Sequence, residues 1–177
     1  ADRYFDIFLG DLRNSLLLFL QAPIIAGLTV LVWRNVGQAT NTLYFVMVLS
    51  AVWIGCTNAS REIVKERAIF FRERMVGVEV SAYVFSKVRI LSMLGFVQCV
   101  LLIGIVNYWI HLLGNKLLLF LTLYLCSFSG MMLGLLISAI MNSQDKAVGM
   151  VPLLIIPQFL FSEFALPKEL HEGLTKY

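Results

Sequence analysis

The residues of this chain that can do chemistry are concentrated in one charged stretch, SREIVKERAIFFRERMVGV, at residues 60–78. Its carboxylates and basic groups can form ion pairs with lipid headgroups or with another protein. No catalytic motif accompanies them: the sequence contains no GxxxxGK[ST] phosphate loop, no GxSxG nucleophile turn and no HExxH pair. His111 and His171 are isolated from each other. The sequence therefore predicts electrostatic docking, and it predicts neither a catalytic centre nor a metal site.

This charged stretch has three faces when it is placed on a helix. The apolar face carries Val64, Ala68, Phe71 and Met75, which recur at helical spacing. The basic flank carries Arg61, Lys65 and Arg72, and the acidic face carries Glu62, Glu66 and Glu73. Anionic headgroups attract the basic flank but repel the acidic face. We therefore expect a helix on the membrane surface whose acidic face meets a protein; the alternative is a solvated helix without a partner.

The rest of the chain is strongly apolar, which indicates the kind of elements that hold this stretch in place. Hydrophobic residues make up 59% of the 177 residues and charged residues 14%, against roughly 25% charged in globular proteins. So little polar surface indicates a membrane domain. The net charge of +3 is too small to argue for a nucleic-acid partner. The three cysteines lie in apolar runs without a CxxC pair, which is typical of buried thiols.

Five apolar segments predict an all-α, polytopic transmembrane helix bundle. The predicted spans are 16–33, 43–59, 90–113, 117–141 and 147–166. The first of these would be about 27 Å long as a helix, close to the hydrocarbon core of about 30 Å. Residues 1–14 place aromatic residues at helical spacing, which predicts an amphipathic helix in the membrane interface.

The distribution of basic residues predicts the orientation of the bundle. The N-terminal segment, residues 60–89 and the 142–146 loop share one side and contain ten of the fourteen Lys and Arg residues. Because cytoplasmic loops are rich in Lys and Arg, the N-terminus and the 60–89 loop are predicted to be cytoplasmic. The protein is accordingly expected to be integral to a membrane.

Polar and small residues inside the predicted spans indicate contacts between helices. Gly130 and Gly134 form a GxxxG pair that allows close helix approach, within the bundle or, less often, in a dimer. Asn58, Gln98 and similar residues can line a polar path or bond neighbouring helices, and the second role is the commoner one. Glu163, near the end of the fifth span, is either hydrated or a functional carboxylate.

Two segments resemble a known family. WIGCTNASREIVKERAIFFRERMVG (53–77), followed by YVFSKV (83–88), resembles the membrane domain of ABC-2 type transporters, in particular the ABCG-like class and its bacterial relatives. ISAIMNSQDKAVGMVPLLIIPQFLFS (137–162) resembles the passage between that family's fourth and fifth spans. In those bacterial relatives, forkhead-associated and ATP-binding domains precede the membrane part. The resemblance to them implies that the membrane is the bacterial inner (plasma) membrane. The family has six spans, so this chain is expected to be a fragment that lacks the sixth.

The resemblance implies that this permease domain couples ATP hydrolysis by an associated ABC ATPase to export, within a homodimer or pseudo-dimer of membrane domains. ATP and Mg²⁺ are then expected on the ATPase, and no cofactor on this chain. Residues 1–14 would be the connecting helix and 60–78 the coupling region. The residues implied in coupling are Glu62, Lys65, Glu66, Phe70, Arg72, Glu73 and Arg74. The candidate cleft-lining residues are Trp53, Asn58, Pro157, Gln158 and Phe159, and the candidate outer gate is Glu163.

Two other functions fit the same composition. A passive channel would need no energised partner, so the charged stretch would only anchor it to the membrane surface. A membrane scaffold would use that stretch to recruit a cytoplasmic protein without transporting anything. An ATPase domain encoded in the same reading frame would favour the exporter over both.

Overall fold

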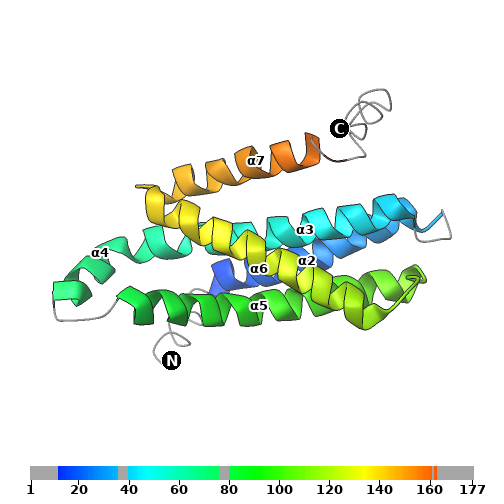
Figure 1. Cartoon of the computed structure of the whole chain (residues 1–177), viewed down its shortest axis with the longest axis horizontal. Coiled ribbons are helices and arrows are strands. Elements are labelled where there is room, and N and C mark those ends of the chain that lie inside the picture. The colour runs from blue at the N-terminus through cyan, green and yellow to red at the C-terminus, as the bar shows by residue number, and fades with distance from the viewer. Residues whose placement is uncertain (1–11, 36–39, 76–79, 161, 163–177) are drawn as a thin grey trace, which may run out of the picture.

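The structure of the chain is a computed structural model that describes residues 12–35, 40–75, 80–160 and 162; the side chains of 12–15, 68–69 and 71–75 lie outside the description. All regular elements in these ranges are α-helices (Figure 1). In chain order they are α2 (Leu12–Trp33), α3 (Asn41–Ala59), α4 (Glu62–Met75), α5 (Val80–Trp109), α6 (Lys116–Ile140) and α7 (Gln144–Leu160). Most of the expected connecting helix at 1–14 lies outside the described residues.

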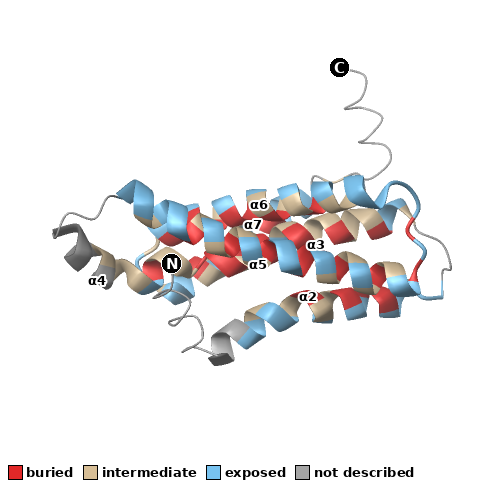
Figure 2. Ribbon diagram, turned by 90° about the horizontal axis from the view of Figure 1, so that it is seen from below, coloured by how far each residue is buried: buried red, intermediate tan, exposed pale blue. Residues whose placement is uncertain are grey.

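Four of these helical stretches are long and apolar enough to cross a membrane. They are Leu16–Trp33 in α2, Asn41–Arg67 from α3 into α4, α5 as a whole and α6 as a whole. Large apolar side chains point outwards along the bundle, with Leu31 75% and Met93 71% exposed. Figure 2 shows exposed residues along the outer faces of the helices and buried residues where the helices meet. An apolar exterior of this kind is what a lipid environment requires, so the chain is an integral membrane protein.

The fifth predicted span stays a prediction. Helix α7 has 17 residues and is described only to Leu160, whereas the predicted span reaches residue 166. Pro152 and Pro157 lie inside α7, and a helix in a membrane tolerates proline when neighbouring groups satisfy the freed carbonyls.

Helix α5 differs most from the predicted spans. It begins at Val80, ten residues before the predicted start at residue 90, and it ends at Trp109. The sequence analysis took Lys87 and Arg89 as marks of a loop, but both lie within the continuous helix. At 1.5 Å per residue, its 30 residues extend about 45 Å, longer than a hydrocarbon core of about 30 Å. A helix of this length either tilts or projects beyond the apolar layer, and the first turns of α5 contact α4.

Helices α3 and α6 pack against each other so closely that only glycine fits at three points, which we call the glycine seam (Gly55, Gly130 and Gly134). A methyl group at Gly55 would overlap the carbonyl oxygen of Ser127 on α6. Methyl groups at Gly130 and Gly134 would overlap the carbonyl oxygens of Val52 and Cys56 on α3. The GxxxG pair of α6 thus packs within the bundle, the first of the two roles predicted from the sequence.

The two ends of the bundle differ in their connections. At one end, Tyr44 of α3 binds the α5–α6 connection: its hydroxyl donates to the carbonyl oxygen of Leu113 and accepts from the same residue's amide, both at 2.9 Å. Gly114 turns the chain there with a φ of 95°, and Asn115 caps α6. At the other end lie α4 and the connection from α6 to α7 (Figure 1).

Candidate functional site

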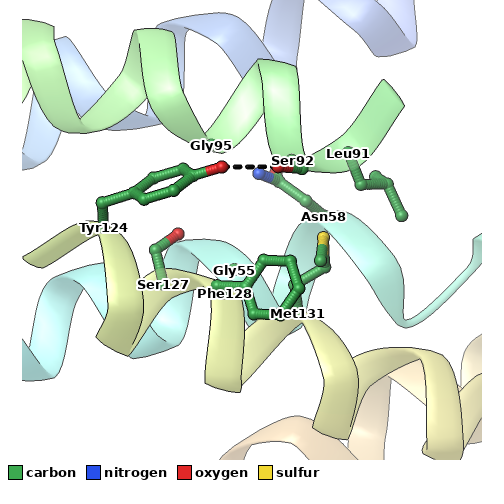
Figure 3. Close-up of a pocket in the computed structure, with 9 residues that line it drawn as sticks. All are labelled: Gly55, Asn58, Leu91, Ser92, Gly95, Tyr124, Ser127, Phe128 and Met131. Atoms are coloured by element: carbon green, nitrogen blue, oxygen red, sulfur yellow. Dashed lines mark hydrogen bonds between the residues drawn. The ribbon is translucent and has the colours of Figure 1, made fainter. Parts of the chain in front are cut away.

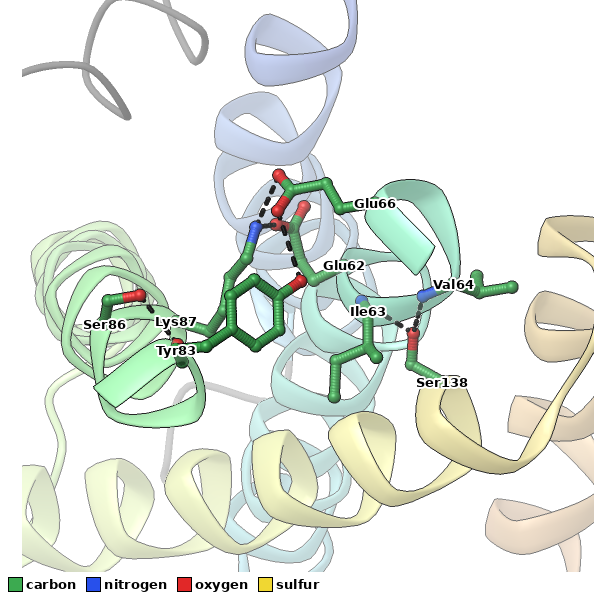
Figure 4. A network of polar contacts seen from close by, with 8 residues as sticks. All are labelled: Glu62, Ile63, Val64, Glu66, Tyr83, Ser86, Lys87 and Ser138. Carbon is green, nitrogen blue, oxygen red and sulfur yellow. Dashed lines mark hydrogen bonds and ion pairs between the residues drawn. The ribbon is translucent and has the colours of Figure 1, made fainter. Parts of the chain in front are cut away.

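The candidate site is the region where α4 contacts three of the longer helices. Its first contact is at the start of α4, whose free backbone amides need acceptors. Ile63 and Val64 each donate a backbone N–H to the hydroxyl oxygen of Ser138, both at 3.0 Å (Figure 4). Ser138 belongs to α6 and is buried. A side chain of another helix therefore caps α4, and this cap fixes the start of α4 against α6.

The second contact is a cluster of charged and polar groups between α4 and α5, which we call the ionic junction (Glu62, Glu66, Tyr83 and Lys87). The Lys87 Nζ lies 2.6 Å from Glu66 Oε1 and 3.3 Å from Glu62 Oε2. The Tyr83 hydroxyl donates to Glu66 Oε2 at 3.2 Å. Glu62 and Glu66 are four residues apart on one helix, and Tyr83 and Lys87 are four apart on the other. Equal spacing brings the two pairs face to face (Figure 4).

Burial makes this junction more than a surface ion pair. The Lys87 side chain is 1% exposed, whereas the side chains of Glu62 and Glu66 are 19% and 17% exposed. Exposed ion pairs contribute little to stability, but a buried ammonium group requires partners because its desolvation is costly. Lys87 has two carboxylates as partners, both from α4. A movement that took α4 away from α5 would leave this cation without them.

Aromatic packing supports the same junction. The rings of Phe70 on α4 and Tyr83 on α5 lie 4.6 Å apart between centroids, in a tilted arrangement. The Lys87 ammonium group lies 5.7 Å from the centroid of the Tyr83 ring. Tyr83 therefore contacts Phe70, Lys87 and Glu66 at once, through its ring faces and its hydroxyl. These contacts restrict how α4 can turn relative to α5.

The third contact joins α4 to the end of α6 and the start of α7. The Arg67 Nη1 donates to the Met141 carbonyl oxygen at 3.2 Å and to Asn142 Oδ1 at 2.8 Å. A cation suits this place because the last carbonyls of α6 have no partner within the helix. Val64 adds an apolar contact, since it packs in a cluster that includes Ala147 and Val151 of α7. Helix α4 is therefore attached to α5, α6 and α7 together.

The structure places part of the predicted coupling set in this region. Glu62, Glu66 and Phe70 contact α5 directly, and Lys65 is exposed on α4. The side chains of Arg72, Glu73 and Arg74 lie outside the described residues, as does Glu163. Glu62 and Glu66 have a partner within the chain, Lys87, whereas their acidic face predicts contact with another protein. The coupling role of all these residues stays a prediction.

Four residues of the site were missing from the predicted set: Arg67, Tyr83, Lys87 and Ser138. Tyr83 and Lys87 were among the positions that carry the family resemblance, and their spacing of four matches that of Glu62 and Glu66. This shared spacing is a signal that sequence reasoning can use. Ser138 gave no comparable signal, because a serine in an apolar helix commonly bonds its own helix backbone.

The candidate cleft-lining residues separate into two groups. Trp53, Pro157, Gln158 and Phe159 are exposed on the outside of the single chain, and their lining role stays a prediction. Asn58 is 3% exposed, and its Nδ2 donates to Gln98 Oε1 at 2.6 Å. Gln98 in turn donates to the Leu18 carbonyl oxygen at 2.7 Å. Asn58 therefore bonds helices to one another, the second of the roles considered for it.

The cavity beside Asn58 is small. Ser92, Tyr124 and Ser127 also line it, and the Ser92 and Tyr124 hydroxyl groups lie 2.5 Å apart (Figure 3). Its volume is about 10 Å³, whereas pockets for small molecules measure roughly 300–1,000 Å³. This cavity cannot hold a transported molecule. The lining role of Trp53 and Phe159 is not tested by this cavity and stays a prediction.

Comparison with known proteins agrees with the resemblance seen in the sequence. The model of the family described as ABC-2 type transporter matches residues 1–173. The ABC transporter ATP-binding/permease protein Rv1747 of Mycobacterium tuberculosis is 30% identical over an aligned length of 142 residues, and the alignment covers 74% of this chain. The match spans 16% of the length of that relative. No solved structure matches the chain.

Proposed function

The chain belongs to the ABC-2 type transporter family and is a membrane permease part of an ABC transporter, and we propose that it exports a substrate by coupling to ATP hydrolysis. The nucleotide-binding domain that hydrolyses ATP would be on the same polypeptide or on a separate one, and ATP and Mg²⁺ would bind there. The name of the mycobacterial relative, which combines ATP-binding and permease parts, supports such a partner. Two permease domains, identical or related, would enclose the transport path.

The attachment of α4 carries this proposal. Ser138 holds the start of α4 on α6, the ionic junction holds its middle on α5, and Arg67 holds it on the α6–α7 connection. A force applied to α4 would therefore act on three helices at once. Closure of an ATPase dimer against α4 would supply that force. The helices of the bundle would then change from one packing arrangement to another, because packed helices move as rigid bodies when a small contact is displaced.

The proposed orientation places α4 in the cytoplasm, where an ATPase can reach it. Of the fourteen Lys and Arg residues, the predicted topology assigns ten to the side of α4 and four to the opposite side, which favours this orientation. Lys65 is exposed on α4 and serves as a reporter. In intact cells, a Lys65→Cys variant should resist labelling by a thiol reagent that cannot cross membranes and should react after permeabilisation. Labelling from outside the intact cell would contradict the orientation.

The two other functions explain less of the geometry. A passive channel could use a surface helix as an anchor, but an anchor needs no buried cation shared with a spanning helix. A scaffold could recruit a cytoplasmic protein through α4, but recruitment needs no attachment of α4 to three helices. Both would leave the helix packing unchanged when nucleotide is added, and this difference separates them from the exporter.

A measurement of helix movement tests the proposal without knowledge of the substrate. Leu28 on α2 and Leu153 on α7 are 60% and 63% exposed, so cysteines there can carry spin labels. Cys56 and Cys99 are buried, and the half-buried Cys126 is replaced by serine so that it is not labelled. In the full-length protein, the distance between the labels should differ between the nucleotide-free state and a trapped ATP-bound state. A passive channel or scaffold predicts one unchanged distance in both states.

A pair of variants then asks whether the ionic junction carries the movement. Lys87→Met removes the ammonium group, whereas Lys87→Arg keeps the charge. We expect Lys87→Met to hydrolyse ATP but to lose the nucleotide-dependent change in distance, with coupling weakened at least about fivefold. Lys87→Arg should retain most of the nucleotide-dependent change in distance. A Lys87→Met protein that is folded and moves like the wild type would show that the junction does not couple.

A further inference from the structure

A groove between α2 and α5 lies at the end of the bundle opposite α4. Its volume is about 520 Å³, which is within the range of sites that bind small molecules. The floor is apolar and is formed by Gly27, Val30, Leu31 and Ile105. The mouth is formed by Arg34 and Asn35, just beyond the end of α2, and by Trp109, the last residue of α5. The groove therefore combines an apolar channel with a cation at one end.

The cation at the mouth is available for an anionic ligand. Arg34 is exposed, and no carboxylate pairs with it among the residues that the structure describes. Its guanidinium carbon lies 5.2 Å from the centroid of the Trp109 ring. This cation–π contact holds the guanidinium group over the groove. A guanidinium group presents paired N–H donors that match the oxygens of a phosphate.

The neighbouring aromatic residues indicate that the mouth lies at the level of lipid headgroups. Tyr108 and Trp109 are 81% and 54% exposed, and their rings meet edge to face. Exposed Tyr and Trp at the end of a spanning helix are typical of the membrane interface. Gly27 lies seven residues before Arg34, so it is about 10 Å deeper along the helix. The floor is therefore at the depth of acyl chains.

We propose that this groove is a binding site for an anionic phospholipid, with its phosphate on Arg34 and one acyl chain along the floor. Charge and depth together favour this occupant over a second copy of the chain, because a helix packed there would leave the Arg34 cation without a counterion. The proposal depends only on the membrane location of the bundle. It does not depend on the coupling role proposed for α4.

Two glycines provide a matched pair of variants for the floor of the groove. A Cβ atom added at Gly27 would meet no described atom within 4 Å, so a larger side chain there fills the groove without displacing the protein. Gly104 on α5 is equally open but does not line the groove. Gly27→Leu should therefore exclude the acyl chain, and Gly104→Leu should not. Arg34→Gln removes the charge at the mouth and keeps a polar side chain of moderate length.

The test uses the full-length protein in phosphatidylcholine nanodiscs that contain phosphatidylglycerol, with the retained lipid counted by native mass spectrometry. We expect Arg34→Gln to lower retained phosphatidylglycerol about fivefold, Gly27→Leu to lower it similarly, and Gly104→Leu to leave it unchanged. Retained phosphatidylcholine should be the same in all variants.

Three results would overturn the proposal. Retention of phosphatidylglycerol that is unchanged in both Arg34→Gln and Gly27→Leu would show that the groove is not a lipid site. A loss in Arg34→Gln alone would assign the arginine to general attraction by the membrane surface. A change in oligomeric mass with unchanged lipid would identify the occupant as a second copy of the chain.

Discussion

The glycine seam and the ionic junction hold helices together by opposite means. In the seam, α3 and α6 meet backbone to backbone, and no charged group takes part. In the junction, α4 and α5 meet through the long side chains of Lys87, Glu62 and Glu66, with one cation between two carboxylates. Close backbone contact permits only one arrangement, since any shift creates overlap. Long side chains can adjust to a small displacement of the helices while their ion pairs remain intact.

We therefore expect the glycine seam and the ionic junction to have different roles in the chain. The seam keeps α3 and α6 as one rigid pair, whereas the junction lets α4 change its position while it remains attached to α5. A bundle that changes between two packings needs both kinds of contact. Variants in the two regions should accordingly have different effects: those in the seam should lower the free energy of unfolding, and those in the junction should alter movement.

The largest effect is expected in the seam. Gly130→Ala places a methyl group against the Val52 carbonyl oxygen, and a backbone carbonyl cannot move aside as a side chain can. We expect a loss of about 3 kcal/mol or more in the free energy of unfolding, measured by denaturation of the full-length protein in detergent. Gly104→Ala is the matched control, because a methyl group there meets no described atom. Equal stability of the two variants would show that α3 and α6 are not in such close contact.

A smaller effect is expected where α6 caps α4. Ser138→Ala removes the acceptor of the Ile63 and Val64 amides, which should destabilise the start of α4 by about 1 kcal/mol. Hydrogen exchange should become faster at these two amides and remain slow in α3 and α6. Ser138→Thr keeps the hydroxyl group and should exchange like the wild type. Unchanged exchange in Ser138→Ala would contradict the cap.

The smallest effect concerns the polar link inside the bundle. A double-mutant cycle with Asn58→Leu and Gln98→Leu isolates the hydrogen bond between these two side chains. We expect a coupling energy of about 0.6 kcal/mol, because hydrogen bonds between membrane helices are weak once alternative partners are counted. A coupling energy near zero would mean that the two amides contribute independently.

The sequence was more informative about single helices than about pairs of helices. Four of the five apolar runs coincide with helical stretches that are long and apolar enough to cross a membrane, because each run carries its own composition and length. The pair of Gly130 and Gly134 indicated close packing, since two small residues on one face have that effect in any bundle. The role of Gly55, the glycine of α3 that faces α6, could not be predicted, because one glycine in an apolar run does not reveal which helix lies beside it.

The sequence indicated only the α4 side of the ionic junction, because a sequence pattern does not show which helices contact each other. The helical spacing placed Glu62 and Glu66 on one face, but a helical wheel does not show what that face meets. Lys87 was counted as a basic residue of a cytoplasmic loop, although it lies in a continuous helix and is buried. Its burial depends on α4 folding back onto α5, which is a contact between distant parts of the chain. Ser138 is still farther in sequence from the Ile63 and Val64 amides that it binds.

An exchange of charges across the junction tests the account most directly. Lys87→Glu and Glu66→Lys each disturb the balance of one cation and two carboxylates, whereas the double variant restores that balance with the positions reversed. In the full-length protein with spin labels at positions 28 and 153, each single variant should lose the nucleotide-dependent change in distance, and the double variant should recover it. If folded single variants keep the change, or if a folded double variant does not recover it, the ionic junction does not transmit movement from α4 to the bundle.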